Sequence, residues 1–258
     1  MRVFRAIAIL VLASRFPLAA TAGPLDDAIA AEGRDDCATA VSNYQALAEK
    51  GNIQAFKRLG YFSLIGYCAK RDWLDAAKWY GRATTTGDED AAGSLGHIGR
   101  NWRFMYKTPM DPIIYEMIEK AAKRGSAVSQ FSLAVMNFPI SDPTFDGKKG
   151  NLNEALIWYR RAADQGDVDS LVAMGIAYAD GIGVPQDYVE AHKWFNVAAP
   201  RSKFEDIRND IMKRRDDLAA KMTPTQIAEA QKLAREWRAM CPTTNDDAPA
   251  PANPNCRR

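Results

Sequence analysis

Few side chains in this 258-residue sequence could do chemistry, and their spacing favours structural roles. There are four cysteines, Cys37, Cys68, Cys241 and Cys256, and two histidines, His97 and His192. The cysteines form no C-x-x-C pair, so they lack the spacing of a typical metal site. No Ser-x-x-Lys, His-Glu-x-x-His, Gly-x-Ser-x-Gly or phosphate-binding glycine–lysine loop occurs. The sequence therefore predicts no catalytic residue, no metal and no cofactor.

One aromatic cluster could instead bind a partner. Trp102, Phe104 and Tyr106 lie in a short run that departs from the regular pattern around it. Aromatic side chains often anchor protein interfaces, so these three are candidate partner-binding residues. The alternative is that the rings pack over a gap left by an irregular repeat. The sequence leaves both interpretations open.

The elements that carry these residues follow a repeat. The helix pattern Ala-x-x-Trp-Tyr/Phe begins at Ala76, Ala155 and Ala191, and weaker copies begin at Ala40 and Ile114, so that successive copies are 36, 38, 41 and 36 residues apart. A second helix pattern precedes it in four units and begins four residues after a closing glycine, at Ala55, Ala91, Ser129 and Ser170. This constant register predicts stacked helix pairs. We expect Trp79, Trp158 and Trp194 to occupy equivalent buried positions, and small residues such as Gly175 and Ala191 to let the paired helices approach closely.

The clearest unit, residues 166–199, carries a long motif. Its members are Ser170, Met174-Gly175, Tyr178, Gly181-Ile182-Gly183-Val184, Asp187, Ala191, Trp194-Phe195 and Ala198-Ala199. This motif resembles the Sel1-like repeat, a helix-turn-helix unit related to the tetratricopeptide repeat. The resemblance implies an all-α fold, a right-handed α–α solenoid. We expect about four repeats plus a leading helix over residues 23–200.

The two ends of the chain have different compositions. Arg2 and Arg5 precede an apolar run, and Ala20-Thr21-Ala22 offers a cleavage site, so residues 1–22 are predicted to be a signal peptide. Residues 201–240 show two amphipathic helix patterns, the second opening on the capping box Thr223-Pro224-Thr225-Gln226, and we expect them to cap the array. Residues 241–258 form a proline-rich tail without core-forming residues, which we expect to be disordered.

An exported chain with an even number of cysteines favours disulfides. Cys37 lies at the start of one predicted helix, and Cys68 lies just past the end of the next. These two ends are neighbours in an antiparallel pair, so we expect a Cys37–Cys68 disulfide. Cys241–Cys256 would then close the tail.

Charge and composition limit the possible functions. Removing residues 1–22 takes away three of the 34 basic residues and none of the 32 acidic ones, which leaves 31 basic against 32 acidic residues. The charges are interleaved, so the sequence predicts no nucleic-acid footprint. No segment after the signal peptide is apolar enough to span a membrane.

Two functions from different classes remain. The first is a non-catalytic scaffold in the periplasm, or secreted, that buries a segment of another protein against the first helices of the repeats. The resemblance supports it, since Sel1-like proteins are commonly adaptors in signalling and assembly. The alternative is a β-lactamase-like or cell-wall-ligand-binding protein, as some cysteine-rich Sel1-like proteins are described. Those carry a cysteine pair in each repeat, whereas this chain offers at most one pair in the array.

Overall fold

The fold is built from helices. The computed structural model describes residues 23–106, 110–138, 140 and 151–239, and no strand occurs in these ranges. The all-α prediction is therefore confirmed. The predicted signal peptide, Cys241, Cys256 and the proline-rich tail lie outside the described residues.

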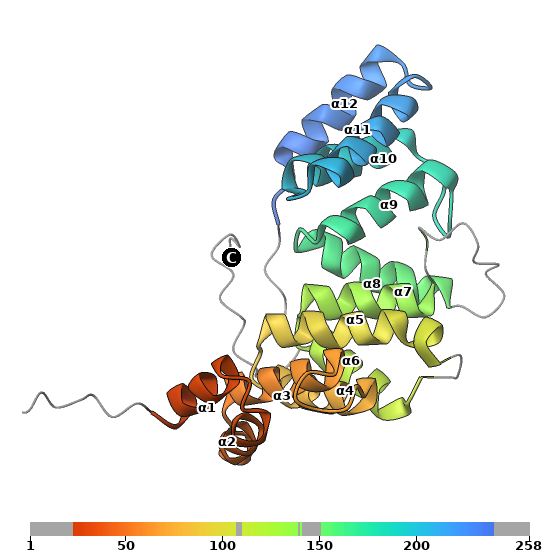
Figure 1. The fold of residues 1–258 in the computed structure, drawn as a ribbon. Coiled ribbons are helices and arrows are strands. Elements are labelled where there is room, and N and C mark those ends of the chain that lie inside the picture. The colour runs from red at the N-terminus through yellow and green to blue at the C-terminus, as the bar shows by residue number, and fades with distance from the viewer. Residues whose placement is uncertain (1–22, 107–109, 139, 141–150, 240–258) are drawn as a thin grey trace, which may run out of the picture.

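Ten helices form five successive antiparallel pairs, which stack from the α1–α2 pair at one end toward α11 and α12 at the other (Figure 1). They are α1 (Pro24–Gly33), α2 (Cys37–Glu49), α3 (Ile53–Ile65), α4 (Trp73–Thr84), α5 (Glu89–Tyr106), α6 (Pro112–Lys123), α7 (Ala127–Asn137), α8 (Leu152–Asp164), α9 (Val168–Asp180) and α10 (Tyr188–Ala198). The short turn η1 (Ala199–Arg201) leads into α11 (Glu205–Ala219) and α12 (Pro224–Glu236). This stack is an α–α solenoid.

The front of the array contains one helix more than the sequence patterns indicated. The helix that begins at Cys37 was expected to stand alone, but α1 packs against it and completes a fifth pair. Within α1, Ala28 and Ala31 are fully buried. Its fully buried residues are alanines, and it lacks the Leu/Met-Gly/Ala pair of the later first helices, which is why the repeat pattern did not reveal it; those pairs are Leu59-Gly60, Leu95-Gly96, Leu133-Ala134 and Met174-Gly175.

One backbone position keeps the pairs in register. Gly51, Gly87, Gly125 and Gly166 follow α2, α4, α6 and α8, and all have positive φ, between 80° and 102°. Glycine adopts this left-handed conformation without the steric penalty that a Cβ atom brings. The chain thus reverses at the same point of each unit, and the following first helix begins two residues later.

The glycines of two first helices leave room for aromatic rings of the second helices, whereas the sequence suggested that they let the two backbones approach closely. A Cβ atom on Gly175 of α9 would lie 2.6 Å from the ring of Phe195 in α10. A Cβ atom on Gly60 of α3 would lie 3.1 Å from the ring of Tyr80 in α4. In both pairs, the glycine makes room for the second residue of the Trp-Tyr/Phe motif, twenty positions later. The missing side chain therefore accommodates an aromatic ring.

The tryptophans of the motif are buried to different extents. Trp158 is 6% exposed and Trp194 is fully buried, as expected. Trp79 is only half-buried, so the expectation of three equally buried positions was wrong for this residue. Its ring stacks on Phe56 with centroids 6.2 Å apart and lies under Arg82, which therefore covers part of its outer surface.

The last pair of helices covers the end of the array. Both α11 and α12 pack on α10, and Ile211, Leu218 and Ala230 are buried there. The predicted capping box is present, because Thr223 accepts a hydrogen bond from the Gln226 N–H while the Gln226 side chain accepts one from the Thr223 N–H. Within the described residues, no helix combines the length and hydrophobicity that a membrane span needs.

Candidate functional site

The first helices α1 and α3 form the walls of a groove at the front of the array. Helix α1 begins with Pro24 at its first position, and Asp26 accepts a hydrogen bond from the Gly23 N–H at 2.9 Å. Helix α3 begins after Asn52, whose side chain accepts from the Ala55 N–H, and ends at Gly66 in the left-handed conformation. Both walls therefore have defined starting points.

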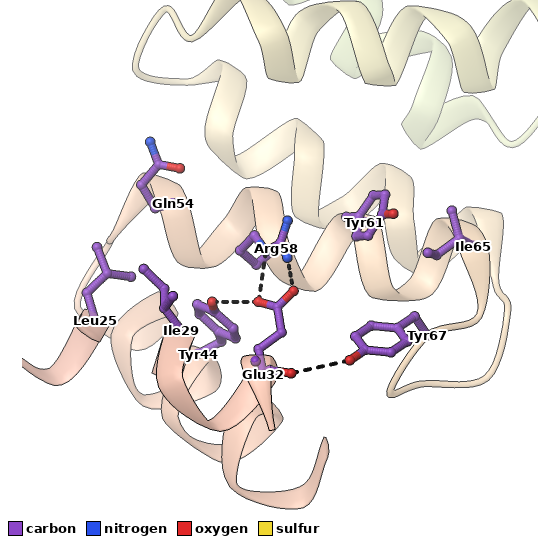
Figure 2. Close-up of a pocket in the computed structure, with 10 residues that line it drawn as sticks. Leu25, Ile29, Glu32, Tyr44, Gln54, Arg58, Tyr61, Ile65 and Tyr67 are labelled. Atoms are coloured by element: carbon purple, nitrogen blue, oxygen red, sulfur yellow. Dashed lines mark hydrogen bonds and ion pairs between the residues drawn. The ribbon is translucent and has the colours of Figure 1, made fainter. Parts of the chain in front are cut away.

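The groove has a volume of about 770 Å³ and is open to solvent. Its lining residues are Leu25, Ile29, Glu32 and Gly33 of α1, Tyr44 of α2, Gln54, Arg58, Tyr61 and Ile65 of α3, and Tyr67 just beyond α3. Ile29 is 53% exposed, Tyr61 39% and Ile65 47%. Figure 2 shows the side chains of the two walls facing one another across this space. The groove thus leaves apolar surface uncovered.

A polar cluster crosses the floor of the groove. Arg58 of α3 forms an ion pair with Glu32 of α1, and its Nε lies 3.1 Å from Glu32 Oε2. The buried Tyr44 hydroxyl donates to the same oxygen at 2.8 Å, and burial raises the pKa of Tyr44. The carboxylate therefore receives three donated contacts. Such a satisfied cluster favours a structural role over acid–base chemistry.

A disulfide lies next to Tyr67, one of the residues that line the groove. Cys37 and Cys68 are joined, with Cα atoms 4.9 Å apart, which is the pairing expected from the positions of the helix ends. Next to it, the Tyr67 hydroxyl donates to Asp35 Oδ1 at 2.6 Å, and this hydrogen bond raises the pKa of Tyr67. The link ties the start of α2 to the turn after α3 and fixes Tyr67 against the end of α1.

The aromatic run proposed as a binding rim lies elsewhere. Trp102 is in α5 and is 6% exposed within the hydrophobic core, so the structure corrects its assignment as a partner-binding residue. The packing interpretation fits Trp102, because α5 belongs to the irregular second repeat. Phe104 and Tyr106 also lie on α5, but their side chains are outside the described part of the structure.

The two histidines have structural surroundings. His192 of α10 is 2% exposed, its Nδ1 lies 2.8 Å from Asn196 Nδ2, and burial lowers its pKa. His97 of α5 is exposed and lies beside the Trp73 ring at 6.1 Å. Across the described ranges, no three His, Cys, Asp or Glu side chains gather as metal ligands would.

A second polar cluster lies on the first helices farther along the array. Arg100 of α5 donates to Ser132 of α7 at 2.6 Å and lies over the Phe131 ring, and burial lowers the Arg100 pKa. Asp167, which caps α9, accepts from the Ser170 N–H at 2.8 Å. Burial raises the pKa of Asp167 to about 6, although the Ser170 hydrogen bonds and the Arg100 charge oppose the shift. This cluster is packed between helices and lies outside the groove between α1 and α3.

Sequence reasoning missed the groove because it missed α1. Leu25, Ile29 and Glu32 are spaced at four and three residues, which is one helical face and could have been read as such. The gap itself has no sequence signal, since it arises from how two helices distant in sequence are spaced.

Comparison with known proteins agrees with the repeat. The sequence model of the Sel1 repeat family matches residues 57–88, 144–167 and 168–199, and leaves out the irregular second unit. The Sel1-repeat-containing protein YjcO of Escherichia coli K12 is 26% identical over 165 residues, covering 63% of this chain and 67% of that protein. The uncharacterized protein YjcO of Shigella flexneri matches to the same extent.

Two solved structures share the fold. One is c5321, a protective antigen present in uropathogenic Escherichia coli strains with an SLR fold; it has a TM-score of 0.60 and 24% identity. That match covers 84% of this chain but 45% of c5321, so this chain spans less than half of that structure. The other is a Sel1 repeat protein from Oxalobacter formigenes, with a TM-score of 0.54, 21% identity and coverage of 84% and 86%. The helix pairs, their register and these matches together show that the chain carries Sel1 repeats.

Proposed function

We propose that this protein is a non-catalytic scaffold that holds a segment of another protein in the groove between α1 and α3. The observation that carries the proposal is the uncovered apolar surface of Ile29, Tyr61 and Ile65 around a space of about 770 Å³. Contiguous exposed apolar surface commonly marks an interaction site, and burying it would drive association. Sel1 repeats typically mediate interactions between proteins, which supports the same class of function.

We also propose that the protein acts after export, in the periplasm or outside the cell. The signal-peptide pattern of residues 1–22 supports this location, and so does the Cys37–Cys68 disulfide, because disulfides persist in oxidising compartments. Function in envelope signalling or assembly would follow from such a location. The polar residues that line the groove are tyrosines, a glutamine, an arginine and a glutamate, which are suited to binding. The lining contains no serine, cysteine, histidine or lysine.

Site-specific cross-linking in cells tests the scaffold. A photoreactive amino acid replaces Ile29 or Ile65 in the groove, and in matched controls it replaces Ile113 of α6 or Ile157 of α8. The control side chains are 48% and 53% exposed, but they lie on second helices. We expect a discrete cross-linked polypeptide from the groove positions and none from the controls. Identical products from all four positions, or none from the groove, would refute the proposal.

A further inference from the structure

The two walls of the groove carry side chains at helical spacing. On α3, Gln54, Arg58, Tyr61 and Ile65 follow one another at four, three and four residues, and all four line the groove. The row runs over 11 helical steps, or about 16 Å at the helical rise of 1.5 Å per residue. On α1, Leu25 and Ile29 are one turn apart on the opposite wall (Figure 2). The groove is therefore about three helical turns long.

The charged groups on the floor of the groove are already paired with each other, so they do not favour a charged group on a bound segment. Glu32 and Arg58 neutralise each other, and the Tyr44 hydroxyl donates to Glu32 as well. An occupant with a charge directed at the floor would lose hydration without gaining an uncommitted partner. Apolar side chains directed at the floor would instead cover Leu25, Ile29 and Ile65. The residues pointing inward from the occupant are therefore apolar.

The α1 side of the groove is acidic. Asp26 in its first turn and Asp35 and Asp36 after its end are exposed, and Arg34 is the cation among them. Asp27 lies on another side of α1, because it lines a separate small pocket with Asn43 and Leu47 of α2 and with Lys50. Two neighbouring cations are engaged elsewhere, because Lys57 contacts Asp88 and Asp90 at 3.2 and 2.9 Å and Arg71 lies over the Trp73 ring. A chain with 31 basic and 32 acidic residues after residue 22 thus concentrates negative charge beside this groove.

We propose that the groove binds a basic amphipathic helix of about three turns from a partner protein. Its apolar face, with residues at positions i, i+4 and i+7, packs between α1 and α3, and its Lys or Arg residues face the aspartates that flank α1. Helix-in-groove recognition uses this spacing of anchors, and ridges of side chains on a helix fit the grooves between others. The inference deepens the proposed function and rests on it.

Peptide display provides the test. A library of randomised 20-residue peptides is selected on the purified protein, and the peptides that bind are measured by fluorescence anisotropy. We expect them to carry net positive charge and apolar residues at helical spacing. Ile29→Asp and Ile65→Asp should each weaken binding at least about 10-fold, because each removes burial of one large apolar side chain. Ile113→Asp and Ile157→Asp, which make the same change on second helices, should leave binding unchanged.

A charge variant tests the acidic flank. Asp26→Lys should weaken binding of the basic peptides about 2- to 5-fold at low salt, the size expected for an exposed ion pair. Asp206→Lys is the matched control, because Asp206 occupies the first turn of α11 and changes the net charge equally. Equal weakening by both variants would overturn the charge assignment.

The remaining outcomes overturn the helix itself. Selected peptides that are acidic, or proline-rich and extended, would refute the proposed class of partner, and so would a failure to select any peptide. If Ile29→Asp and Ile65→Asp leave the peptide affinity unchanged, the peptides bind outside the groove. Cross-linking from Ile29 and Ile65 in cells uses no peptide, so the scaffold can stand even when the basic helix fails.

Discussion

At the scale of single residues, the groove floor depends on one ion pair whose carboxylate is largely removed from water. The Glu32 side chain is 14% exposed and the Arg58 side chain 39%. Such a pair adds little stability by itself, because desolvation offsets the attraction, but removing one partner leaves the other charge uncompensated. The two residues are therefore expected to behave as a unit.

Arg58→Leu should lower the free energy of unfolding by about 1–3 kcal/mol, since Glu32 keeps a desolvated charge without its cation. The double variant Glu32→Leu/Arg58→Leu should recover part of that loss. Urea denaturation followed by circular dichroism measures both values. A double variant less stable than Arg58→Leu would contradict the assignment of the loss to an uncompensated charge.

Asp167 provides a prediction about pH. Burial raises its pKa from the usual 3.8 to about 6, so the folded protein binds this proton more tightly than the unfolded chain does. The stabilisation from protonation is complete below about pH 4 and is lost as the pH rises through 6. Asp167→Asn retains a good N-cap without the charge, so it should be more stable than the wild type at pH 7.5 by about 1–2 kcal/mol. Thermal unfolding of both proteins at pH 7.5 and at pH 4 makes the comparison. If Asp167→Asn is more stable than the wild type by the same amount at both pH values, the pKa of Asp167 is not raised.

At the scale of helices and helix pairs, stability should vary along the array, because each pair contacts mainly its neighbours. Among the described residues, no further helix pair covers the outer side of the α1–α2 pair, whereas α10 is covered by α11 and α12. The Cys37–Cys68 disulfide ties this end to α3 across a separation of 31 residues.

Removing this disulfide should loosen the front of the array first. Cys37→Ser/Cys68→Ser is expected to lose about 2–4 kcal/mol of stability, the usual contribution of a cross-link of this loop length. Hydrogen exchange with mass spectrometry should show faster exchange in α1, α2 and α3, while α8, α9 and α10 change little. Uniformly faster exchange would show that the solenoid unfolds as one unit and would contradict the prediction.

The glycine–ring contacts give a graded series. Gly175→Ala places a Cβ atom against the Phe195 ring and should cost about 1–3 kcal/mol, with a smaller loss for Gly60→Ala, whose nearest ring atoms are farther away. Gly93→Ala is the control, because its nearest neighbour would lie at an ordinary 3.9 Å, and it should gain about 0.5–1 kcal/mol of helix propensity. Chemical denaturation ranks the three variants. A Gly175→Ala protein as stable as the wild type would mean that the ring has room to move.

The elements themselves were mostly predictable because their signals are local. Asp187 caps α10 through the Val189 and Glu190 N–H groups, and an aspartate immediately before a helix is a local sequence signal of such a cap. Helix α1 escaped prediction because its buried residues are alanines, which give weak periodicity. The sequence did not decide whether Trp102 is buried, because the direction of a ring at an irregular position depends on the neighbouring helices. The groove depends on the distance between α1 and α3, which no local pattern encodes.

At the scale of the whole molecule, the two ends of the described solenoid differ in how much apolar surface they leave exposed. The α11–α12 pair covers the last repeat, whereas apolar surface on α1 and α3 stays open to solvent at the front. This asymmetry gives the array a covered end and an end available for binding. A partner held in the groove would cover the exposed apolar residues there, as the terminal helices do at α10.

Hydrogen exchange of the protein with and without its cross-linked partner tests the scaffold most directly. The proposed mode of binding predicts slower exchange in residues 24–33 and 53–65, which form the two walls, with no change in α11 and α12. Protection confined to the second helices or to α11 and α12, with the walls unchanged, would contradict it.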